Sequence, residues 1–318
     1  MTMTTTMKAM VIRDFGGPER LELADVPRPS PGPGQILVAV KATSVNPVDT
    51  KIRRAGAWAR VPMPAILGYD AAGVVAELGT GVTSLQVGDE VFYTPHIFGR
   101  QGTSAEFHVV EADIVAKKPS MLSFEEAASM PLAAITAWDS IVTFFQTRPG
   151  DTVLVHAGAG GVGCFAVQLA KAAGARVLAT GRAENEAFIK ALGADEVIDY
   201  GAGDPLRAAA AHGPFDVVVD CAGGYEGAAC RRLLAPQGRH CIVAGDSPRA
   251  AMQPLMPPFS SKLILGVPLA KNVQPVMDLI ARGEVTIALG ERMPLADLER
   301  AHALSRTGRL TGKLVMKP

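Results

Sequence analysis

Residues 150–171 read GDTVLVHAGAGGVGCFAVQLAK. The apolar run at 153–155 is typical of a buried strand, and the Ala/Val/Leu-rich run after residue 163 is typical of a helix. A strand, a glycine turn and a helix in this order predict the dinucleotide-binding pattern Gly-x-Gly-x-x-Gly at Gly158, Gly160 and Gly163. The glycine spacing alone leaves a simple tight turn between strand and helix as the alternative.

Each glycine of this turn has an expected task in binding a pyrophosphate. Gly158 permits the tight turn, Gly160 lets the backbone approach the phosphates, and Gly163 lets the helix pack closely on the strand. Gly161 and Val162 open the helix, where unpaired N–H groups and the positive end of the helix dipole attract anions. We therefore place both residues in the predicted cofactor-binding set.

Length and composition narrow the class of protein. A chain of 318 residues predicts two domains. Its 31 basic and 31 acidic residues cancel, and no Lys/Arg-rich run indicates nucleic acid or an anionic membrane as a partner. No apolar stretch is long enough to span a bilayer, and the polar amino terminus lacks the pattern of a signal peptide, so we expect a cytoplasmic protein.

The predicted elements divide the chain into a β-rich part and an α/β part. Residues 8–26 indicate a strand pair, and further short strands at 36–42, 74–78, 90–93 and 105–110 favour an antiparallel, barrel-like domain. Helices follow from Phe124, with Ser123 as a candidate N-cap. Strands then alternate with helices, which predicts a doubly wound parallel sheet. The predicted strands of this sheet are 153–156, 176–180, 196–198, 216–220, 239–243 and 262–266. The tail predicts helices at 273–281 and 295–304 and a last strand at 313–315.

Several motifs together resemble one enzyme family. The spacing from Gly150 to Gln168 and Lys171, the segment Asn46-Pro-Val-Asp49 and the segment Gly68-Tyr-Asp are similar to those of the zinc-independent quinone oxidoreductase/zeta-crystallin branch of the medium-chain dehydrogenase/reductase superfamily. The resemblance covers residues 8–318. It implies a GroES-like catalytic domain of residues 1–123, to which 265–318 return, and a Rossmann domain of residues 124–264. It also implies an active site in the cleft between them, and a homodimer.

The end of the second predicted strand indicates which nicotinamide cofactor is bound. An NAD-binding chain usually carries an acidic residue there, whereas this chain has Thr180, Gly181 and Arg182. Arg182 could bind a 2′-phosphate, and Tyr200 matches a family tyrosine near the same phosphate. We therefore predict NADPH. A solvated surface arginine and a packing tyrosine are the respective alternatives.

The resemblance completes the predicted cofactor site with residues from other segments. Thr136 matches a threonine near the nicotinamide, and a helix-packing role is its alternative. Cys221, Ala222, Ala244 and Gly245 follow two further strands and would line the nicotinamide side, unless they form ordinary turns. Lys313, in the terminal Gly312-Lys-Leu-Val segment, belongs to the same predicted set.

The family's zinc positions are changed in this chain. Zinc-dependent relatives carry Cys at the position of Asn46 and His at that of Tyr69, and neither Asn nor Tyr is a good replacement as a ligand. The four cysteines have no short pair spacing, and His96 and His108 are better explained as loop and strand residues. We therefore predict that the enzyme holds no metal.

A metal-independent site suits an acceptor that is already activated. We expect NADPH to reduce a quinone or an alkene conjugated to a carbonyl, with protein donors binding the developing oxyanion. Asn46 and Asp49 match family active-site positions, and Tyr69, Thr136 and Lys51 are further candidate donors.

Each of these assignments has an alternative. Asn46 before Pro47 is also a turn signal, and Asp49 could cap a helix that starts at Thr50. At the level of function, a zinc-type alcohol dehydrogenase relative and an NADPH-binding, crystallin-like protein with little catalysis are the alternatives.

Overall fold

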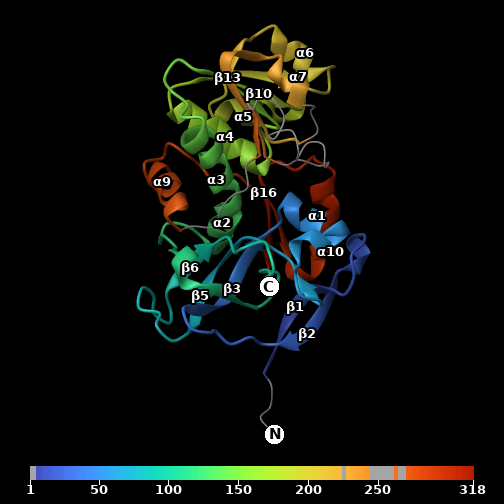
Figure 1. Ribbon diagram of the computed structural model, residues 1–318, viewed down its shortest axis with the longest axis vertical. Coiled ribbons are helices and arrows are strands. Elements are labelled where there is room, and N and C mark those ends of the chain that lie inside the picture. The colour runs from blue at the N-terminus through green and yellow to red at the C-terminus, as the bar shows by residue number, and fades with distance from the viewer. Residues whose placement is uncertain (1–4, 224–226, 244–260, 264–269) are drawn as a thin grey trace. The chain divides into compact units, whose positions relative to one another are not determined.

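The computed structural model describes residues 5–223, 227–243, 261–263 and 270–318 (Figure 1). The chain forms two compact units. Unit 1 comprises Met1–Leu132, Val267–Pro275 and Leu289–Pro318, and unit 2 comprises Ala133–Gly266 and Val276–Ala288. Unit 1 thus continues past the predicted border at residue 123, and a short C-terminal stretch belongs to unit 2. Among the described residues, no helix has the length and apolar character needed to cross a membrane.

Unit 1 is mostly β-structure. Its strands are β1 (Thr6–Ile12), β2 (Glu22–Pro27), β3 (Gln35–Ser44), β4 (Ala65–Ile66), β5 (Ala71–Leu78), β6 (Glu90–Tyr93), β7 (Phe107–Glu111), β8 (Ala116–Lys117), β15 (Leu289–Pro294) and β16 (Lys313–Lys317). Its helices are α1 (Pro47–Ala55), α2 (Phe124–Ser129) and α10 (Leu298–Arg306). Helix α9 (Ala270–Ala281) spans the border between the units, and α3 (Pro131–Trp138) leads into unit 2.

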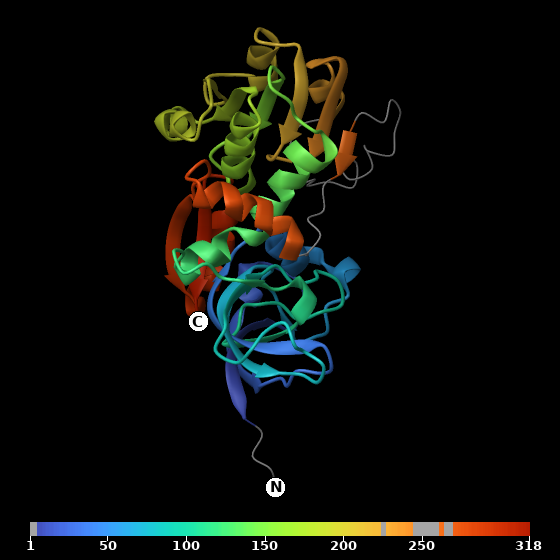
Figure 2. The same ribbon diagram turned by 90° about the vertical axis from the view of Figure 1, so that its left-hand side faces the viewer.

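The strands of unit 1 form two sheets that are largely antiparallel. One has the order β2-β1-β4, and the other has the order β15-β16-β3-β5-β6-β8 with β7 also paired to β3. The predicted antiparallel, GroES-like N-terminal domain is therefore confirmed. Strand β16 pairs antiparallel with β3, with Val315 opposite Ser44. Strand β16 is red and β3 is blue by the colour bar (Figures 1 and 2). This pairing brings the C-terminal strand to the end of β3, where α1 begins.

Three clusters of buried apolar residues lie in unit 1. Ile36, Val38 and Val40 of β3 belong to the first, Val45 and residues of α1 and β16 belong to the second, and residues of β1 belong to the third. The second cluster also contains Tyr69, whose side chain is fully buried. Helix α2 begins at Ser123, whose hydroxyl accepts a hydrogen bond from the Glu126 N–H, so the predicted N-cap is confirmed.

Unit 2 contains a six-stranded parallel sheet with the order β11-β10-β9-β12-β13-β14. Its strands are β9 (Thr152–His156), β10 (Arg176–Gly181), β11 (Glu196–Asp199), β12 (Phe215–Asp220), β13 (Leu234–Ile242) and β14 (Ser261–Leu263). Its helices are α4 (Gly161–Ala172), α5 (Glu186–Ala191), α6 (Pro205–Ala210) and α7 (Gly227–Arg231). A π-helical segment, Asp139–Phe144, follows α3. This strand order is that of a doubly wound dinucleotide-binding fold, as predicted.

One glutamine side chain joins α4 to the C-terminal part of unit 2. The Gln168 amide donates to the Thr286 carbonyl at 3.0 Å, and its oxygen accepts from the Thr286 N–H at 2.7 Å and from the Thr286 hydroxyl at 3.0 Å. Gln168 is buried, so these hydrogen bonds replace those that water would make. The stretch that follows α9 is thereby fixed to the helix after the glycine turn.

Candidate functional site

The start of α1 places two predicted site residues in one capping arrangement. Asn46 has extended backbone and is the N-cap, and Pro47 occupies the first helical position. The Asp49 carboxylate accepts a hydrogen bond from the Asn46 N–H at 2.7 Å. Asp49 therefore reaches back from the third helical position, and the alternative that it caps a helix starting at Thr50 is wrong. The Asn46 side chain contacts Asp70 and Lys313, which lie outside the helix.

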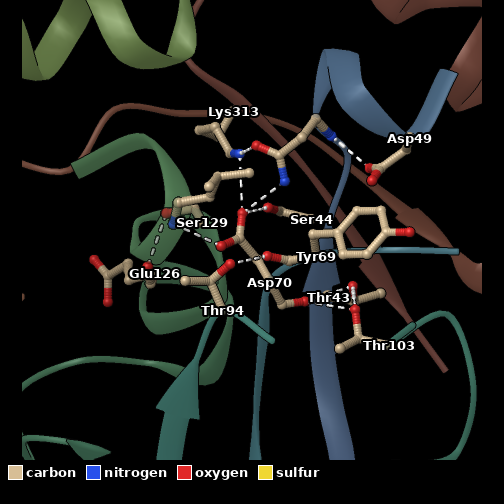
Figure 3. A network of polar contacts seen from close by, with 12 residues as sticks. Thr43, Ser44, Asp49, Tyr69, Asp70, Thr94, Thr103, Glu126, Ser129 and Lys313 are labelled. Carbon is tan, nitrogen blue, oxygen red and sulfur yellow. Dashed lines mark hydrogen bonds and ion pairs between the residues drawn. The ribbon is translucent and has the colours of Figure 1, made fainter. Parts of the chain in front are cut away.

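A buried carboxylate, Asp70, lies within a network of polar contacts (Figure 3). Its Oδ2 accepts hydrogen bonds from the Ser44 hydroxyl at 2.7 Å and from the Asn46 amide at 2.8 Å. Its Oδ1 accepts the Leu132 N–H at 2.7 Å. A buried carboxylate is stable only when it is hydrogen-bonded or paired, and Asp70 is both.

The cation that pairs with Asp70 is Lys313 at the start of β16. Its Nζ lies 3.2 Å from Asp70 Oδ2 and 2.6 Å from Asn46 Oδ1, and the side chain is 5% exposed. Lys313 was predicted among the cofactor-binding residues, and the structure places its ammonium beside Asn46 in unit 1. We call Asn46, Asp70 and Lys313 the polar triad.

Hydroxyl groups fix the backbone that carries Asp70. The Thr94 hydroxyl donates to the Tyr69 carbonyl at 2.6 Å. The hydroxyls of Thr43 and Thr103 donate to the Asp70 carbonyl at 2.7 and 2.8 Å (Figure 3). Such outer contacts hold a polar side chain in one orientation, as in other preorganised sites.

Asp49 and Tyr69 lie beside the triad in a strongly desolvated region. Burial raises the pKa of the Asp49 carboxyl from 3.8 to about 8, and the negative charge of Asp70 adds to this, while the Asn46 N–H and Lys313 act in the opposite direction. Burial, and then the charge of Asp49, also raise the pKa of the Tyr69 phenol. Asp49 Oδ1 and the Tyr69 hydroxyl have no hydrogen-bond partner within the described ranges.

The location of Tyr69 bears on its predicted role as a donor to the substrate. The ring lies in the apolar cluster with Ile52, Leu67 and Met316 and is fully buried. The structure therefore gives the Tyr69 ring a packing role, and donation from its hydroxyl to a substrate stays a prediction. Thr136 lies on α3 in unit 2, buried, with its carbonyl accepting the Ser140 hydroxyl.

The glycine turn of unit 2 has the predicted local structure. The Gly158 N–H donates to the Thr180 carbonyl at 2.8 Å, and a Cβ added at Gly158 would lie 2.8 Å from Ala179 Cβ. A Cβ at Gly163 would lie 2.1 Å from the Ala157 carbonyl oxygen. These two glycines are therefore required by the packing of strand, turn and helix.

Gly160 is different, because the chain's own atoms scarcely crowd it. A Cβ there would lie 3.2 Å from the Ala157 carbonyl oxygen and 4.0 Å from Ala157 Cβ, with nothing nearer. Gly160 is the N-cap of α4, and the first turn contains no acidic side chain. The N–H groups of Gly161 and Val162 belong to this first turn, where they lack partners within the helix. The turn therefore fits a pyrophosphate group.

The end of β10 places Arg182 and Tyr200 near each other, because the Tyr200 N–H donates to the Gly181 carbonyl at 3.0 Å. Both side chains are partly exposed. Arg182 Nη1 donates to Glu184 Oε1 at 2.7 Å, so an anion at Arg182 would compete with this carboxylate. This contact with Glu184 was not predicted from the sequence.

Thr180 has a supporting role in the glycine turn. It is fully buried, and its hydroxyl accepts the Ala157 N–H at 3.1 Å. Cys221 and Ala222 follow β12, and the Ala222 N–H donates to Asp220 Oδ1 at 2.9 Å. The predicted residues Ala244 and Gly245 lie outside the described residues.

Two histidines that were not predicted to be metal ligands differ in their exposure to solvent. His108 lies on β7, buried, with Nδ1 3.0 Å from the Tyr93 hydroxyl and Nε2 3.1 Å from the Gln101 carbonyl. Burial lowers the pKa of His108 to about 4, so this imidazole is neutral at physiological pH. His96 lies in the loop after β6 and is exposed.

The sequence left two important site residues without their present roles. Asp70, in the segment Gly68-Tyr-Asp, was not predicted as a site residue, and Lys313 was predicted to bind the cofactor. The signal for Asp70 was an acidic residue directly before the apolar segment that begins at Ala71. An acid in such a place needs a partner.

Comparisons with known proteins agree with this architecture. Residues 32–120 match the alcohol dehydrogenase GroES-like domain family, and residues 192–316 match the zinc-binding dehydrogenase family. The chain is 34% identical to the chloroplast envelope quinone oxidoreductase homolog of Arabidopsis thaliana over 316 residues, which covers 95% of each chain. It is 33% identical to the NADPH-dependent alkenal/one oxidoreductase of the same plant, covering 98% of this chain and 80% of that protein.

A solved structure shows the same likeness in three dimensions. The quinone oxidoreductase from Coxiella burnetii superposes with a TM-score of 0.91 at 33% identity, over 99% of this chain and 100% of that chain. The identity extends over nearly the whole chain, and both units are matched. The chain therefore belongs to the quinone oxidoreductase family of the medium-chain dehydrogenase/reductase superfamily and is an oxidoreductase.

Proposed function

We propose that this chain is an NADPH-dependent reductase that transfers hydride to a quinone or to an alkene conjugated to a carbonyl group. The polar triad carries the proposal, because it offers hydrogen-bond donors in a region from which water is largely removed. Asn46 and Lys313 are 4% and 5% exposed, respectively. Donors in such surroundings stabilise a developing oxyanion far better than donors in water.

A count of hydrogens shows what the triad has left to donate. The Asn46 amide carries two N–H groups, one of which is used by Asp70. The Lys313 ammonium carries three, of which two are used by Asn46 and Asp70. One hydrogen on each side chain remains for the oxygen of a quinone or enone. Asp70 and Asp49 are then positioning residues, which act through Asn46 and Lys313.

Unit 2 supports NADPH as the cofactor. The glycine turn has space for a pyrophosphate at Gly160. Arg182 and Tyr200 lie near each other at the end of β10. The last residues of this strand include no acidic residue. When bound, NADPH supplies a hydride from C4 of its nicotinamide. The name of the NADPH-dependent alkenal/one relative agrees with this choice.

The proposal includes no catalytic zinc at the family's zinc positions. Asn46 offers an amide that is committed to Asp70 and Lys313, and Tyr69 offers a phenol within the apolar cluster. Zinc in proteins is held by Cys, His and carboxylate ligands, and a catalytic site needs three of them. These two positions therefore do not fit the ion.

The test is oxidation of NADPH against 1,4-benzoquinone, 9,10-phenanthrenequinone, crotonyl and enone acceptors and simple aldehydes. NADH and a metal chelator serve as controls. Turnover of quinones or enones that resists the chelator and prefers NADPH is expected. Turnover of alcohols or aldehydes alone, abolished by the chelator, would overturn the proposal in favour of a zinc-type alcohol dehydrogenase. Tight NADPH binding with no turnover on the whole panel would also overturn it.

A further inference from the structure

Unit 2 buries a cluster of metal-ligating side chains beside the carboxyl ends of two central strands. Asp220 is the last residue of β12, His240 lies on β13, and Cys230 lies on α7. All three are fully buried. Val218 pairs in register with His240, so Asp220, two residues further along β12, lies on the same sheet face as His240. Cys230 packs on this face with Leu154 and Val218.

We propose that Asp220, Cys230 and His240 bind a zinc ion. One potential ligand atom from each residue lies within 4.8 Å of the other two. Ligands of a tetrahedral zinc lie about 3.5 Å apart, given metal–ligand bonds of about 2.0–2.3 Å, so a small contraction completes the site. One thiolate, one imidazole and one carboxylate form a ligand set that suits zinc. The fourth position would hold water or a neighbouring side chain.

The charges of the three groups favour a divalent cation. A carboxylate and a thiolate together carry two negative charges, and a neutral imidazole carries none, so the loaded site is neutral in a buried region. Burial lowers the pKa of His240 to about 4, which keeps its imidazole in the neutral form that binds metals. The Cys230 thiol releases its proton to solvent when the Zn–S bond forms.

Outer contacts fix the carboxylate and connect the site to the chain around it. Asp220 Oδ1 accepts the N–H groups of Ala222 and Gly223, both at 2.9 Å. His156 is the register partner of Asp220 on the neighbouring strand β9. The metal would therefore tie β12, β13 and α7 together.

This site is separate from the zinc positions of the family. Those positions correspond to Asn46 and Tyr69 in unit 1, whereas all four cysteines of the chain, at 164, 221, 230 and 241, lie in unit 2. The proposal also revises the prediction that the protein holds no metal. That prediction rested on the replaced ligands at Asn46 and Tyr69 and on the absence of close Cys pairs, whereas here the ligands come from three other elements, β12, α7 and β13.

Cobalt reports on the site directly, because a Co²⁺–thiolate bond gives a charge-transfer absorption in the near ultraviolet. The full-length protein is treated with a chelator, dialysed and titrated with Co²⁺. One equivalent per chain is expected, with the thiolate absorption and the intense visible absorption of tetrahedral cobalt. Added zinc should displace the cobalt and abolish both signals.

The key variant is Cys230→Ser, and Cys241→Ser is its matched control. Cys241 is also buried but is adjacent to His240 in β13, so its side chain is directed to the other face. Cys230→Ser should lose the thiolate absorption, and Cys241→Ser should keep it. Unaltered absorption in Cys230→Ser, or its loss in Cys241→Ser, would assign the cobalt elsewhere and overturn the proposal.

A second measurement covers the case in which Cys230→Ser does not fold. Zinc should raise the Tm of the chelator-treated wild-type protein, because an ion that binds only the folded state stabilises it. Wild-type protein that binds no Co²⁺, or binds it without thiolate absorption, would show that the cluster is a metal-free polar core. Neither result affects the reductase proposal, which is decided by turnover in the presence of chelator.

Discussion

Lys313 Nζ lies 2.6 Å from Asn46 Oδ1, although 267 residues separate the two in the chain. The contact exists because β16 pairs with β3 and α1 begins just after β3. The C-terminal strand therefore supplies a cation to the N-terminal part of the site. This relationship makes the triad sensitive to changes at either end of the chain.

Replacing Lys313 with Met should strongly destabilise unit 1. The substitution leaves the buried Asp70 carboxylate without its cation, which typically costs about 3–5 kcal/mol in the free energy of unfolding. Chemical denaturation measures the loss. Lys317→Met removes the other lysine of β16, whose ion pair with Glu125 is largely exposed on the lysine side, and should cost less than about 1 kcal/mol. The double variant Asp70→Asn/Lys313→Met should lose less free energy of unfolding than the two single variants lose together.

Replacing Asn46 with Ala should impair turnover more than cofactor binding. Loss of one preorganised oxyanion donor commonly lowers kcat by about 10²–10³-fold. The Kd for NADPH should not change, because unit 2 holds the glycine turn. Thr50→Ala is the control, since Thr50 lies one turn further along α1 and its hydroxyl donates to the Pro47 carbonyl. Equal kcat in Asn46→Ala and wild type would remove Asn46 from the proposed site.

Two glycine substitutions should separate folding from cofactor binding. Gly160→Ala should weaken NADPH binding and lower the Tm only slightly, because the added methyl would occupy the phosphate's space and would meet the Ala157 backbone oxygen at 3.2 Å. Gly163→Ala should cost about 1–3 kcal/mol in stability, because its methyl would lie 2.1 Å from the Ala157 carbonyl oxygen. Thermal unfolding and NADPH titration measure the two effects. A Gly160→Ala protein with unchanged NADPH affinity would contradict the assignment.

Replacing Arg182 with Ala should reduce the preference for NADPH. Hydrogen bonds to charged groups contribute about 1.5–3 kcal/mol, which corresponds to about 10- to 100-fold in Kd for NADPH. The Kd for NADH should stay the same, since NADH lacks the 2′-phosphate. Arg176→Ala removes an arginine from the opposite end of β10, where Arg176 pairs with Glu196, and should leave both affinities unchanged. An equal loss for NADH and NADPH in Arg182→Ala would contradict the proposed phosphate contact.

Asp49 should make stability depend on pH in a defined direction. Its pKa rises from 3.8 to about 8 in the folded protein, so between these values the folded state binds more protons than the unfolded state. The contribution of Asp49 to the free energy of unfolding is therefore fully present below about pH 4. It is lost as pH rises through about 8, by at most about 1.4 kcal/mol per pH unit. Asp49→Asn should lack this slope. Parallel stability profiles of the two proteins across that range would show that Asp49 is ionised in the folded state.

Elements whose structure depends on residues close together in the sequence were predicted best. The strand, glycine turn and helix around Gly158, and the capping of α2 by Ser123, follow from local patterns and were predicted. Strand β15 was not predicted, because its residues are mostly polar or half-exposed at the edge of a sheet. The alternative in which Asp49 caps a helix starting at Thr50 places the start of α1 too late, and the sequence left it open because Asn46 and Asp49 are both good capping residues.

The polar triad could not be derived from spacing along the chain. Asp70 and Lys313 are 243 residues apart, and only the pairing of β16 with β3 brings them together. The same holds for Asp220, Cys230 and His240, which come from two strands and a helix. Ligand motifs are visible in a sequence when the ligands share one element, and these residues do not.

The hydrogen bonds between Gln168 and Thr286 have a consequence for synthesis of the protein. Unit 2 begins near residue 133, yet the partner of its buried glutamine emerges from the ribosome more than a hundred residues after Gln168 itself. Unit 1 in turn needs β16, which pairs with β3 from a distant part of the chain. Each unit is therefore complete in a nascent chain only after segments far apart in the sequence have been synthesised, and neither can be excised as one continuous fragment.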